Sequence, residues 1–163
     1  MGTVIIKLLN EHYKTEKDME RLLRYVAAKG KNKQKELLLQ SSGKGVSFNP
    51  EKATKQMKAV QRAYGKTSGR RLYHLVVSFP KAIRNKEAVT NAAECIAEML
   101  FEDYQVFYGI HASTDNLHVH YAINTVSYAT GKKWHQNKKE LAEMKEIIFQ
   151  LIRHSGLHVD GFI

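Results

Sequence analysis

The segment from Leu117 to Asn124 alternates between two kinds of residue, and this alternation constrains the fold more than any other feature of the chain. Every second residue is apolar: Leu117, Val119, Tyr121 and Ile123. Successive side chains of a β-strand point to opposite faces, so these four would pack together on one side. The other face would carry His118, His120 and Asn124. The pattern predicts a sheet that covers a core on one side and borders a cleft on the other.

A polar turn over 113–116 joins this strand, predicted over 117–127, to a second predicted strand over 104–111. Short polar connections of this kind link antiparallel strands. His111 ends the earlier strand and would therefore return beside His118 and His120. Three imidazoles that converge on one point form the ligand set of a divalent metal with open coordination positions. We interpret these histidines as metal ligands, and by themselves they would suit Zn²⁺ or Mn²⁺ better than Mg²⁺.

Other polar residues of the chain allow more than one interpretation. Asp115 could orient an imidazole through a hydrogen bond behind the metal, or serve as an ordinary turn residue. Asn124 could touch a substrate or a ligand imidazole, or stabilise its strand. Five further histidines share no spacing with the motif, and ordinary core or surface positions are their simplest interpretation: His12, His74, His135, His154 and His158.

Periodicity outlines the remaining elements. Apolar runs over 3–9 and 71–79 predict two more strands. Helical spacing predicts helices over 16–29, 85–101 and 137–154, and Asn49-Pro50 predicts the start of another. Residues 31–44 are basic and rich in Gly and Ser, which predicts a loop that could include a short strand at 37–39. The order predicts one α+β domain over 1–163, with a central antiparallel or mixed sheet and helices packed mainly on one face.

The charge balance favours a polyanionic partner. Lys and Arg number 26 against 16 for Asp and Glu, which gives a net charge of +10. Such an excess points to nucleic acid first and to an anionic membrane surface second. The single cysteine excludes an internal disulfide framework. No apolar run reaches about 18 residues, so no membrane insertion is expected, and the missing signal-peptide pattern favours the cytoplasm.

Tyr25 is a candidate nucleophile in the predicted helix over 16–29. It lies at the edge of the apolar stripe, and Arg21 and Lys29 flank it at i−4 and i+4. A phenol with a pKa of about 10 is inert unless nearby cations or a metal-bound phosphate favour the phenolate. The alternative is a tyrosine at an interface, with its ring buried and its hydroxyl in water.

Basic residues beside the predicted strands could line a groove that follows a phosphate backbone. Four of them form two pairs, one before a strand and one after: Arg70 with Arg71, and Lys132 with Lys133. Arg21 and Lys29, which flank Tyr25, are further candidates for contact with DNA. Each pair alone is also typical of a solvated surface. Trp134, in the same basic loop as the second pair, is the best candidate for stacking on a base.

The three histidines, in the order His111…Asp115…His118-Val119-His120, carry the His-hydrophobic-His signature. With it the chain resembles the relaxases, or mobilisation nucleases, of plasmids and integrative elements, within the HUH endonucleases. Supporting motifs extend over most of the chain: Arg24-Tyr25, Tyr64-Gly65-Lys66, Ser78-Phe79, Ile123-Asn124 and Gly131-Lys132-Lys133. Members of this family usually continue beyond the length of this chain.

The resemblance implies an HUH-endonuclease-like fold and a mechanism. His111, His118 and His120 would hold Mn²⁺ or Mg²⁺, and the cation would grip the scissile phosphate of single-stranded DNA at a transfer origin. Tyr25 stands where one branch of the family places its nucleophile. Its attack would leave a free 3′-hydroxyl and a 5′-phosphotyrosine, and the reverse reaction would rejoin the strand. Accessory relaxosome proteins and a bacterial cytoplasmic location would follow.

Other functions share parts of this pattern. Rolling-circle replication initiators and single-strand transposases of the same superfamily usually place the tyrosine in a helix after the metal motif, whereas the predicted helix over 137–154 contains no tyrosine. A non-catalytic DNA-binding module with a structural metal would form no covalent adduct. A metal-dependent hydrolase that uses water would cut DNA without attaching to it.

Overall fold

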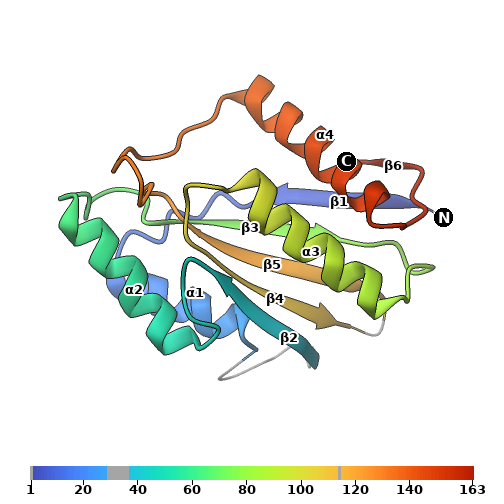
Figure 1. Cartoon of the computed structure of the whole chain (residues 1–163), viewed down its shortest axis with the longest axis horizontal. Helices are drawn as coiled ribbons and strands as arrows, with labels where there is room; N and C mark the ends of the chain where they lie inside the picture. Colours follow the sequence, from blue (N-terminus) through green and yellow to red (C-terminus); the bar gives the residue numbers. More distant parts are fainter. Residues whose placement is uncertain (1, 29–36, 114) are drawn as a thin grey trace.

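The computed structural model describes residues 2–28, 37–113 and 115–163. Within these ranges one sheet has the strand order β2-β4-β5-β3-β1-β6 (Figure 1). The strands are β1 (Thr3–Leu8), β2 (Leu37–Lys44), β3 (Leu72–Ser78), β4 (Val106–Ala112), β5 (Leu117–Asn124) and β6 (Gly161–Phe162). All neighbouring strands pair antiparallel except β1 and β6, which are parallel. The predicted α+β class with a mixed sheet is therefore confirmed.

Four helices accompany the sheet in the described residues: α1 (Glu16–Val26), α2 (Pro50–Ala63), α3 (Lys86–Leu100) and α4 (Lys138–His154). Each begins at a side chain that accepts a hydrogen bond from the first turn: Thr15, Asn49, Asn85 and Asn137. Such caps satisfy backbone donors that a helix leaves without internal partners. None of these helices is both long and apolar enough to cross a membrane.

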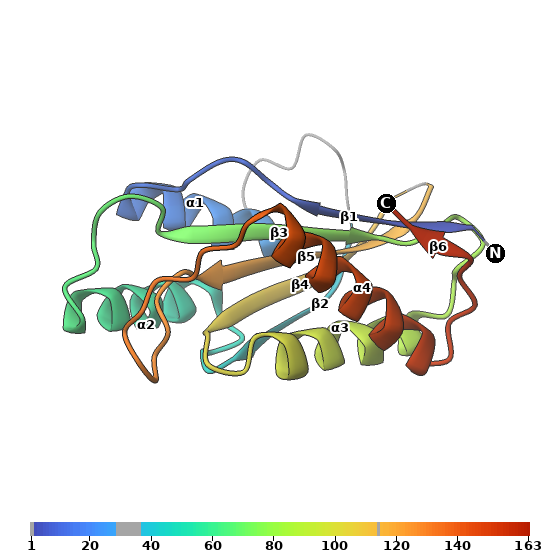
Figure 2. The same cartoon turned by 90° about the horizontal axis from the view of Figure 1, so that it is seen from above.

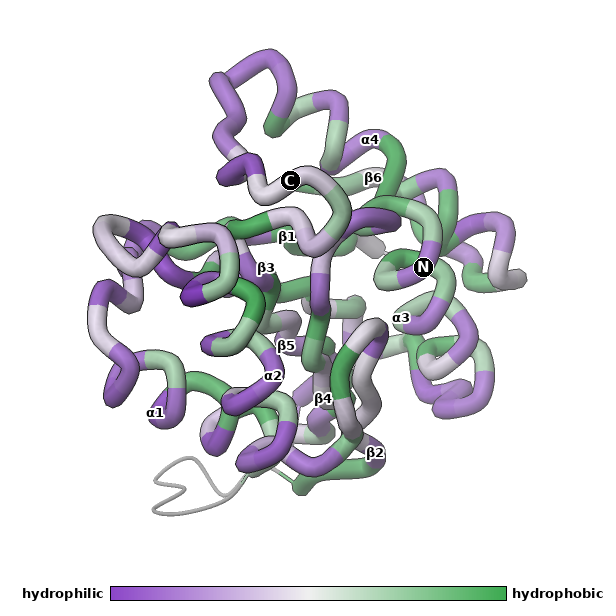
Figure 3. The backbone as a smooth tube through the Cα atoms, turned by 60° about the vertical axis from the view of Figure 1, so that its left-hand side comes forward, coloured by the Kyte–Doolittle hydropathy of each residue, from purple (hydrophilic) through white to green (hydrophobic). Residues whose placement is uncertain are grey.

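The helices lie on both faces of the sheet, not mainly on one as predicted. α3 and α4 cover the face formed by the apolar side of β5, whereas α1 lies across the sheet from them, on the face that carries the histidines (Figure 2). α2 packs against α1 and shares its apolar cluster. The second face has its own apolar patch, because Leu72, Phe107 and Ala122 lie on it and pack against both helices. Figure 3 shows hydrophobic stretches in the central strands and hydrophilic ones along the outer loops.

Two strands differ from the prediction. Residues 37–44, expected mainly as a loop, form β2, which pairs along the whole of β4 with an irregularity between Leu38 and Gln40. Pairing with an available strand edge uses backbone groups, which a Ser- and Gly-rich composition does not reveal. β6 has two residues and was not predicted. α1 ends at Val26, earlier than predicted, and Ala28 follows with a left-handed φ of 54°.

Candidate metal centre and active site

His111, His118 and His120 converge on the face of the β4–β5 hairpin that α1 partly covers. In the antiparallel register His111 lies opposite His118, and Gly109 lies opposite His120. Each of the three rings offers a nitrogen, and these atoms lie within 4.8 Å of one another. All three side chains are buried. The structure thus brings together the residues predicted as ligands, in an arrangement that can hold one divalent cation.

The last residue of α1 fixes the orientation of His111. The Nε2 atom of His111 lies 2.7 Å from the carbonyl oxygen of Val26. A carbonyl only accepts, so Nε2 carries the proton and Nδ1 keeps the lone pair that a metal requires. Gly109 makes this approach possible, because a Cβ there would lie 2.2 Å from the same oxygen. A glycine in a strand interior often marks such a close backbone contact.

His120 has the features of a metal ligand. Its Nδ1 lies 2.9 Å from Nε2 of His74, while its own Nε2 is buried and has no hydrogen-bond partner among the described residues. Burial lowers the pKa of His120 well below its usual value, and charge on His74, His111 or His118 would lower it further. Burial likewise lowers the pKa of His74 to about 4. The neutral imidazole is the form that binds metals, so His120 fits the role of a cation ligand.

Tyr25 reaches the same centre from α1. Its ring centroid lies 5.1 Å from that of His120 and 6.3 Å from that of His111, and the residue is 39% exposed. An open pocket of about 370 Å³ joins Tyr25 to the cluster, and its walls come from β3, β5 and the 113–116 turn: Val76, Ser78, Ser113, Asn116, His118 and His120. A substrate in this pocket could therefore touch both the phenol and the histidine cluster.

Sequence reasoning missed His74 and Tyr13. His74 lies on β3 opposite Ala122, and its ring contacts both His120 and Tyr25. The Tyr13 hydroxyl lies 3.1 Å from Nδ1 of His74. Alternation along β3 places His74 on one face of that strand, but only the strand order shows that this face joins the histidine motif. No local pattern marks Tyr13, which lies in a loop with a left-handed φ of 50°.

Two residues expected near DNA are instead structural. Arg71 is 4% exposed, and its guanidinium donates to Gln61, to the carbonyl of Thr67 and to Glu16. Asn124 is fully buried, and its amide nitrogen donates 2.8 Å to Gln105. This burial contradicts a phosphate contact for Arg71 and a substrate or imidazole contact for Asn124, whose alternative role in stabilising the strand fits its bonds.

Three other basic candidates, Arg70, Lys132 and Lys133, lie near the end of β5 that is far from His118. β5 ends at Asn124, six residues beyond His118, which corresponds to about 20 Å of strand. Arg70 donates to the carbonyl of Glu11 at 2.9 Å, and Lys133 donates to the carbonyl of Ser68 at 2.8 Å. Lys132 is exposed. A DNA path past Arg70, Lys132 and Lys133 stays a prediction.

Three further candidates lie in the 113–116 turn and near Tyr25 in the sequence: Asp115, Arg21 and Lys29. Asp115 is exposed and, in the part of the chain that the structure describes, makes no hydrogen bond to a histidine. Arg21 pairs with Glu11 at 3.0 Å and with Asp18 at 3.4 Å, so its charge is partly compensated. Lys29 lies outside the described residues.

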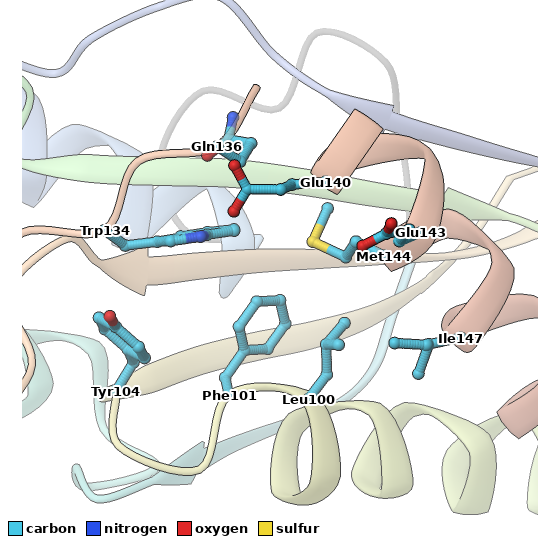
Figure 4. Close-up of a pocket in the computed structure, with 9 residues that line it drawn as sticks. All are labelled: Leu100, Phe101, Tyr104, Trp134, Gln136, Glu140, Glu143, Met144 and Ile147. Atoms are coloured by element: carbon cyan, nitrogen blue, oxygen red, sulfur yellow. The ribbon is translucent and has the colours of Figure 1, made fainter. Parts of the chain in front are cut away.

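Trp134 does not lie at the histidine face. It packs against Tyr73 and Phe101 on the side of the sheet that α3 and α4 cover, in the pocket that Figure 4 shows. The suggested role of Trp134 in stacking on a base stays a prediction, and any such contact would lie away from the histidine cluster. The place of Trp134 in a basic loop does not reveal this packing, because β3 and α3 supply apolar neighbours that the local sequence does not contain.

Comparisons with known proteins agree with this architecture. Residues 25–157 match the family model "Relaxase: MobA/VirD2-like, nuclease domain". "Protein rlx" of Staphylococcus aureus is 31% identical over 116 residues, which cover 71% of this chain and 36% of that protein. "Protein TraI" of Escherichia coli is 28% identical over 108 residues, or 65% of this chain and 15% of that protein. This chain thus corresponds to about a third or less of these relatives.

Solved structures share the fold at low sequence identity. The MobM relaxase domain, in a Mn-bound crystal structure with plasmid pMV158 oriT DNA, superposes with a TM-score of 0.64 at 12% identity, covering 97% of this chain and 89% of that one. A structure from work on vancomycin resistance transfer in Staphylococcus aureus gives a TM-score of 0.56 at 13% identity, covering 76% and 75%. The family match over most of the chain, together with the histidine centre and this fold, shows that the chain belongs to the MobA/VirD2-like relaxase nuclease family.

Proposed function

We propose that this chain nicks and rejoins single-stranded DNA at a transfer origin, with Tyr25 as the nucleophile. One observation carries the proposal: the exposed Tyr25 lines the same open pocket as His118 and His120, two of the three clustered histidines. The structural neighbour MobM, which was crystallised with oriT DNA and Mn, supports a DNA substrate and a divalent cation. We place the reaction in the bacterial cytoplasm, with the nuclease unit contained in residues 1–163 and accessory relaxosome proteins as further partners.

The chemistry is a transesterification. The Tyr25 oxygen forms a bond to the scissile phosphorus, the bond from phosphorus to the 3′ oxygen breaks, and the phenol proton is released as the 3′-hydroxyl takes one up. The resulting 5′-phosphotyrosine conserves the phosphodiester bond, so attack by a 3′-hydroxyl restores the strand and the free phenol. His111, His118 and His120 would hold Mn²⁺ or Mg²⁺, with Zn²⁺ as a third choice, and the cation would supply positive charge beside a phosphoryl oxygen.

The chain's own residues position the substrate. α1 anchors its apolar side in the core through Met19, Leu22 and Leu23 and so presents Tyr25 at the pocket rim. Ser78 and Asn116 line the same pocket with groups that can donate hydrogen bonds to phosphate oxygens, and the Ser113 hydroxyl holds Asn116 by donating to its Oδ1 at 3.0 Å. Such preorganised donors cost no rearrangement during the reaction.

The test is adduct formation. The purified protein is incubated with Mn²⁺ and labelled single-stranded oligonucleotides from a suspected transfer origin, and the products are separated on denaturing gels. We expect a covalent protein–DNA band that Tyr25→Phe abolishes. Tyr128→Phe is a matched control, since Tyr128 is similarly exposed, at 43% against 39%. Free cleaved DNA without an adduct would indicate a water-using hydrolase, and unchanged DNA with retained binding would indicate a non-catalytic module.

A further inference from the structure

A chain of hydrogen bonds runs from the metal centre to the surface through residues that have no place in the reaction above. We propose that His74, held by Tyr13, is a positioning residue that keeps His120 in the one tautomer able to bind a cation. This inference rests on the three-histidine centre of the proposed function, and it does not depend on whether Tyr25 attacks DNA.

The contacts are short and shielded from water. Nε2 of His74 lies 2.9 Å from Nδ1 of His120, and Nδ1 of His74 lies 3.1 Å from the Tyr13 hydroxyl. Both ring nitrogens of His74 are therefore engaged. The three residues are each 6% exposed or less, so water does not compete for these bonds. Buried networks of this kind specify one arrangement when every member is satisfied.

The positions of the ring protons determine the direction of each hydrogen bond between His120, His74 and Tyr13. A cation needs the lone pair of His120 Nε2, the atom that has no hydrogen-bond partner among the described residues. Nδ1 of His120 then carries the proton and donates to Nε2 of His74. A neutral His74 must carry its own proton on Nδ1 and donate it to the Tyr13 oxygen. The Tyr13 hydroxyl is then left as a donor, and we assign as its acceptor the carboxylate of Glu11, whose charge acts on Tyr13.

The series of hydrogen bonds ends at the protein surface. Glu11 pairs with Arg21 at 3.0 Å, so the acceptor at the end is a carboxylate held in place by a cation. Burial and the Glu11 charge raise the pKa of Tyr13, which keeps its hydroxyl protonated as a donor. Tyr13 also has a left-handed φ of 50°, a conformation that costs a bulky residue energy and that the surrounding structure must impose.

Metal affinity tests this role directly. We expect Mn²⁺ titration by calorimetry to show binding about 10–100-fold weaker for His74→Phe, the usual loss when an outer partner of a ligand histidine is removed. His74→Gln should retain much of the affinity, because its amide oxygen can accept from His120 Nδ1. Tyr13→Phe should weaken binding less than His74→Phe. His135→Phe is the control, since His135 is exposed and remote from the motif.

The outcomes are separable from those of the nicking assay. Equal Mn²⁺ affinity of wild type and His74→Phe, or equal loss in His74→Phe and His74→Gln, would overturn the positioning role. A proton resonance for Nδ1 of His120 in the Zn²⁺-loaded protein, lost in His74→Phe, would support it without any activity measurement. Failure of wild type to form a DNA adduct would count against the nicking proposal alone.

A different observation supports a second site on the opposite face. Between α3 and α4 lies a pocket of about 240 Å³ with aromatic walls and acidic residues at its rim (Figure 4). The rings are those of Phe101, Tyr104 and Trp134, and the carboxylates are those of Glu140 and Glu143. We infer that this pocket receives an arginine side chain from a partner protein.

Charge and hydrogen bonding select that occupant. The chain as a whole is strongly basic, yet the lining of this pocket contains two carboxylates and no Lys or Arg, which disfavours a phosphate backbone. Gln136 also lines the pocket, and its Oε1 has no hydrogen-bond partner among the described residues. A guanidinium offers several donors in a plane, pairs with carboxylates and stacks on aromatic rings. Exposed Met99 and Ile147 lie on the flanking helices and suit apolar neighbours of that arginine.

Trp134 is the single tryptophan of the chain and so reports on this pocket alone. We expect its fluorescence to change saturably with the peptide acetyl-Leu-Arg-Leu-amide and less with the citrulline analogue. Glu143→Gln should weaken the response, whereas Glu146→Gln, on the same helix but outside the pocket lining, should not. An equal response to both peptides, no saturable response, or an equivalent response to single-stranded DNA would overturn the assignment.

Discussion

The carbonyl oxygen of Val26 lies 2.7 Å from Nε2 of His111, which ties the last turn of α1 to a candidate metal ligand. Tyr25 is the neighbour of Val26, so one backbone segment positions the proposed nucleophile and orients part of the proposed metal site. A change in where α1 meets β4 would therefore disturb both functions together.

Gly109→Ala tests this coupling. The added Cβ would meet the Val26 oxygen at 2.2 Å, so α1 must shift. We expect a loss of about 1–3 kcal/mol in the free energy of unfolding, as for an overpacked site, together with weaker Mn²⁺ binding. Urea denaturation and calorimetry measure the two effects. Gly161→Ala, where no atom lies within 4 Å of the added Cβ, is the control. Unchanged stability and Mn²⁺ affinity in Gly109→Ala would refute the coupling.

Acid should destabilise the metal-free protein through His74. Its pKa is about 4 in the folded chain, below the ordinary value of 6.5, chiefly because of burial. Between pH 4 and pH 6.5 the unfolded chain binds a proton at His74 that the folded chain excludes. The contribution of neutral His74 to the free energy of unfolding is therefore full above pH 6.5 and is lost as the pH falls toward 4. His74→Phe should lose stability less steeply across this window, by an amount on the order of 3 kcal/mol. Parallel pH profiles of unfolding free energy would contradict the expectation.

A bound cation should stabilise the fold by mass action. Mn²⁺ at a hundred times its dissociation constant would add about 2.7 kcal/mol, which corresponds to a melting-temperature rise of about 5–10 °C for a domain of this size. We expect His118→Ala to abolish the rise and His135→Ala to retain it, as measured by thermal unfolding with and without a chelator. Repeating the scan with Mg²⁺ and Zn²⁺ ranks the candidate ions. An equal rise in His118→Ala would place the cation elsewhere.

Arg71→Ala should act on stability. The buried guanidinium donates to Gln61 and Glu16. Its removal leaves the buried Oε1 of Gln61 without that donor, whereas Glu16 keeps its pair with Arg62. We expect a cost of about 1–3 kcal/mol, as for a buried polar group that loses its hydrogen-bond partner. Chemical denaturation measures it, and Lys66→Ala, an exposed residue in the same region, is the comparison. A fully stable Arg71→Ala variant with weakened DNA binding would restore the role first expected for this residue.

DNA binding should depend steeply on salt. Each phosphate contact by Lys or Arg releases counterions. For single-stranded DNA, each contact steepens the slope of log affinity against log salt concentration by about 0.7. Lys132→Ala should lower that slope by about one contact without changing stability. Fluorescence anisotropy with a labelled oligonucleotide at several salt concentrations gives the slope. A flat salt response of the wild type would exclude a phosphate-lined groove.

Local patterns in the sequence were sufficient to predict several parts of the molecule. Strict alternation over 117–124 and the polar turn before it predicted the hairpin and the convergence of His111, His118 and His120, because strand parity and hairpin pairing are short-range geometry. Helix caps at Asn49 and Asn137 were readable for the same reason. The composition revealed an excess of basic residues but not which of them are available to DNA. A buried guanidinium such as that of Arg71 cannot be told from an exposed one by composition.

Only the tertiary structure decided which distant segments meet. The strand order β4-β5-β3 brings His74 beside His120, and the loop before α1 brings Tyr13 to His74. The apolar patch around Phe107 packs against α1, so Tyr25 faces the histidines. Trp134 likewise packs on the face covered by α3 and α4, because it contacts Tyr73 and Phe101, which are distant in the sequence. These contacts depend on packing between elements, and such packing is set by the whole sheet and its two cores, so no window of sequence contains it.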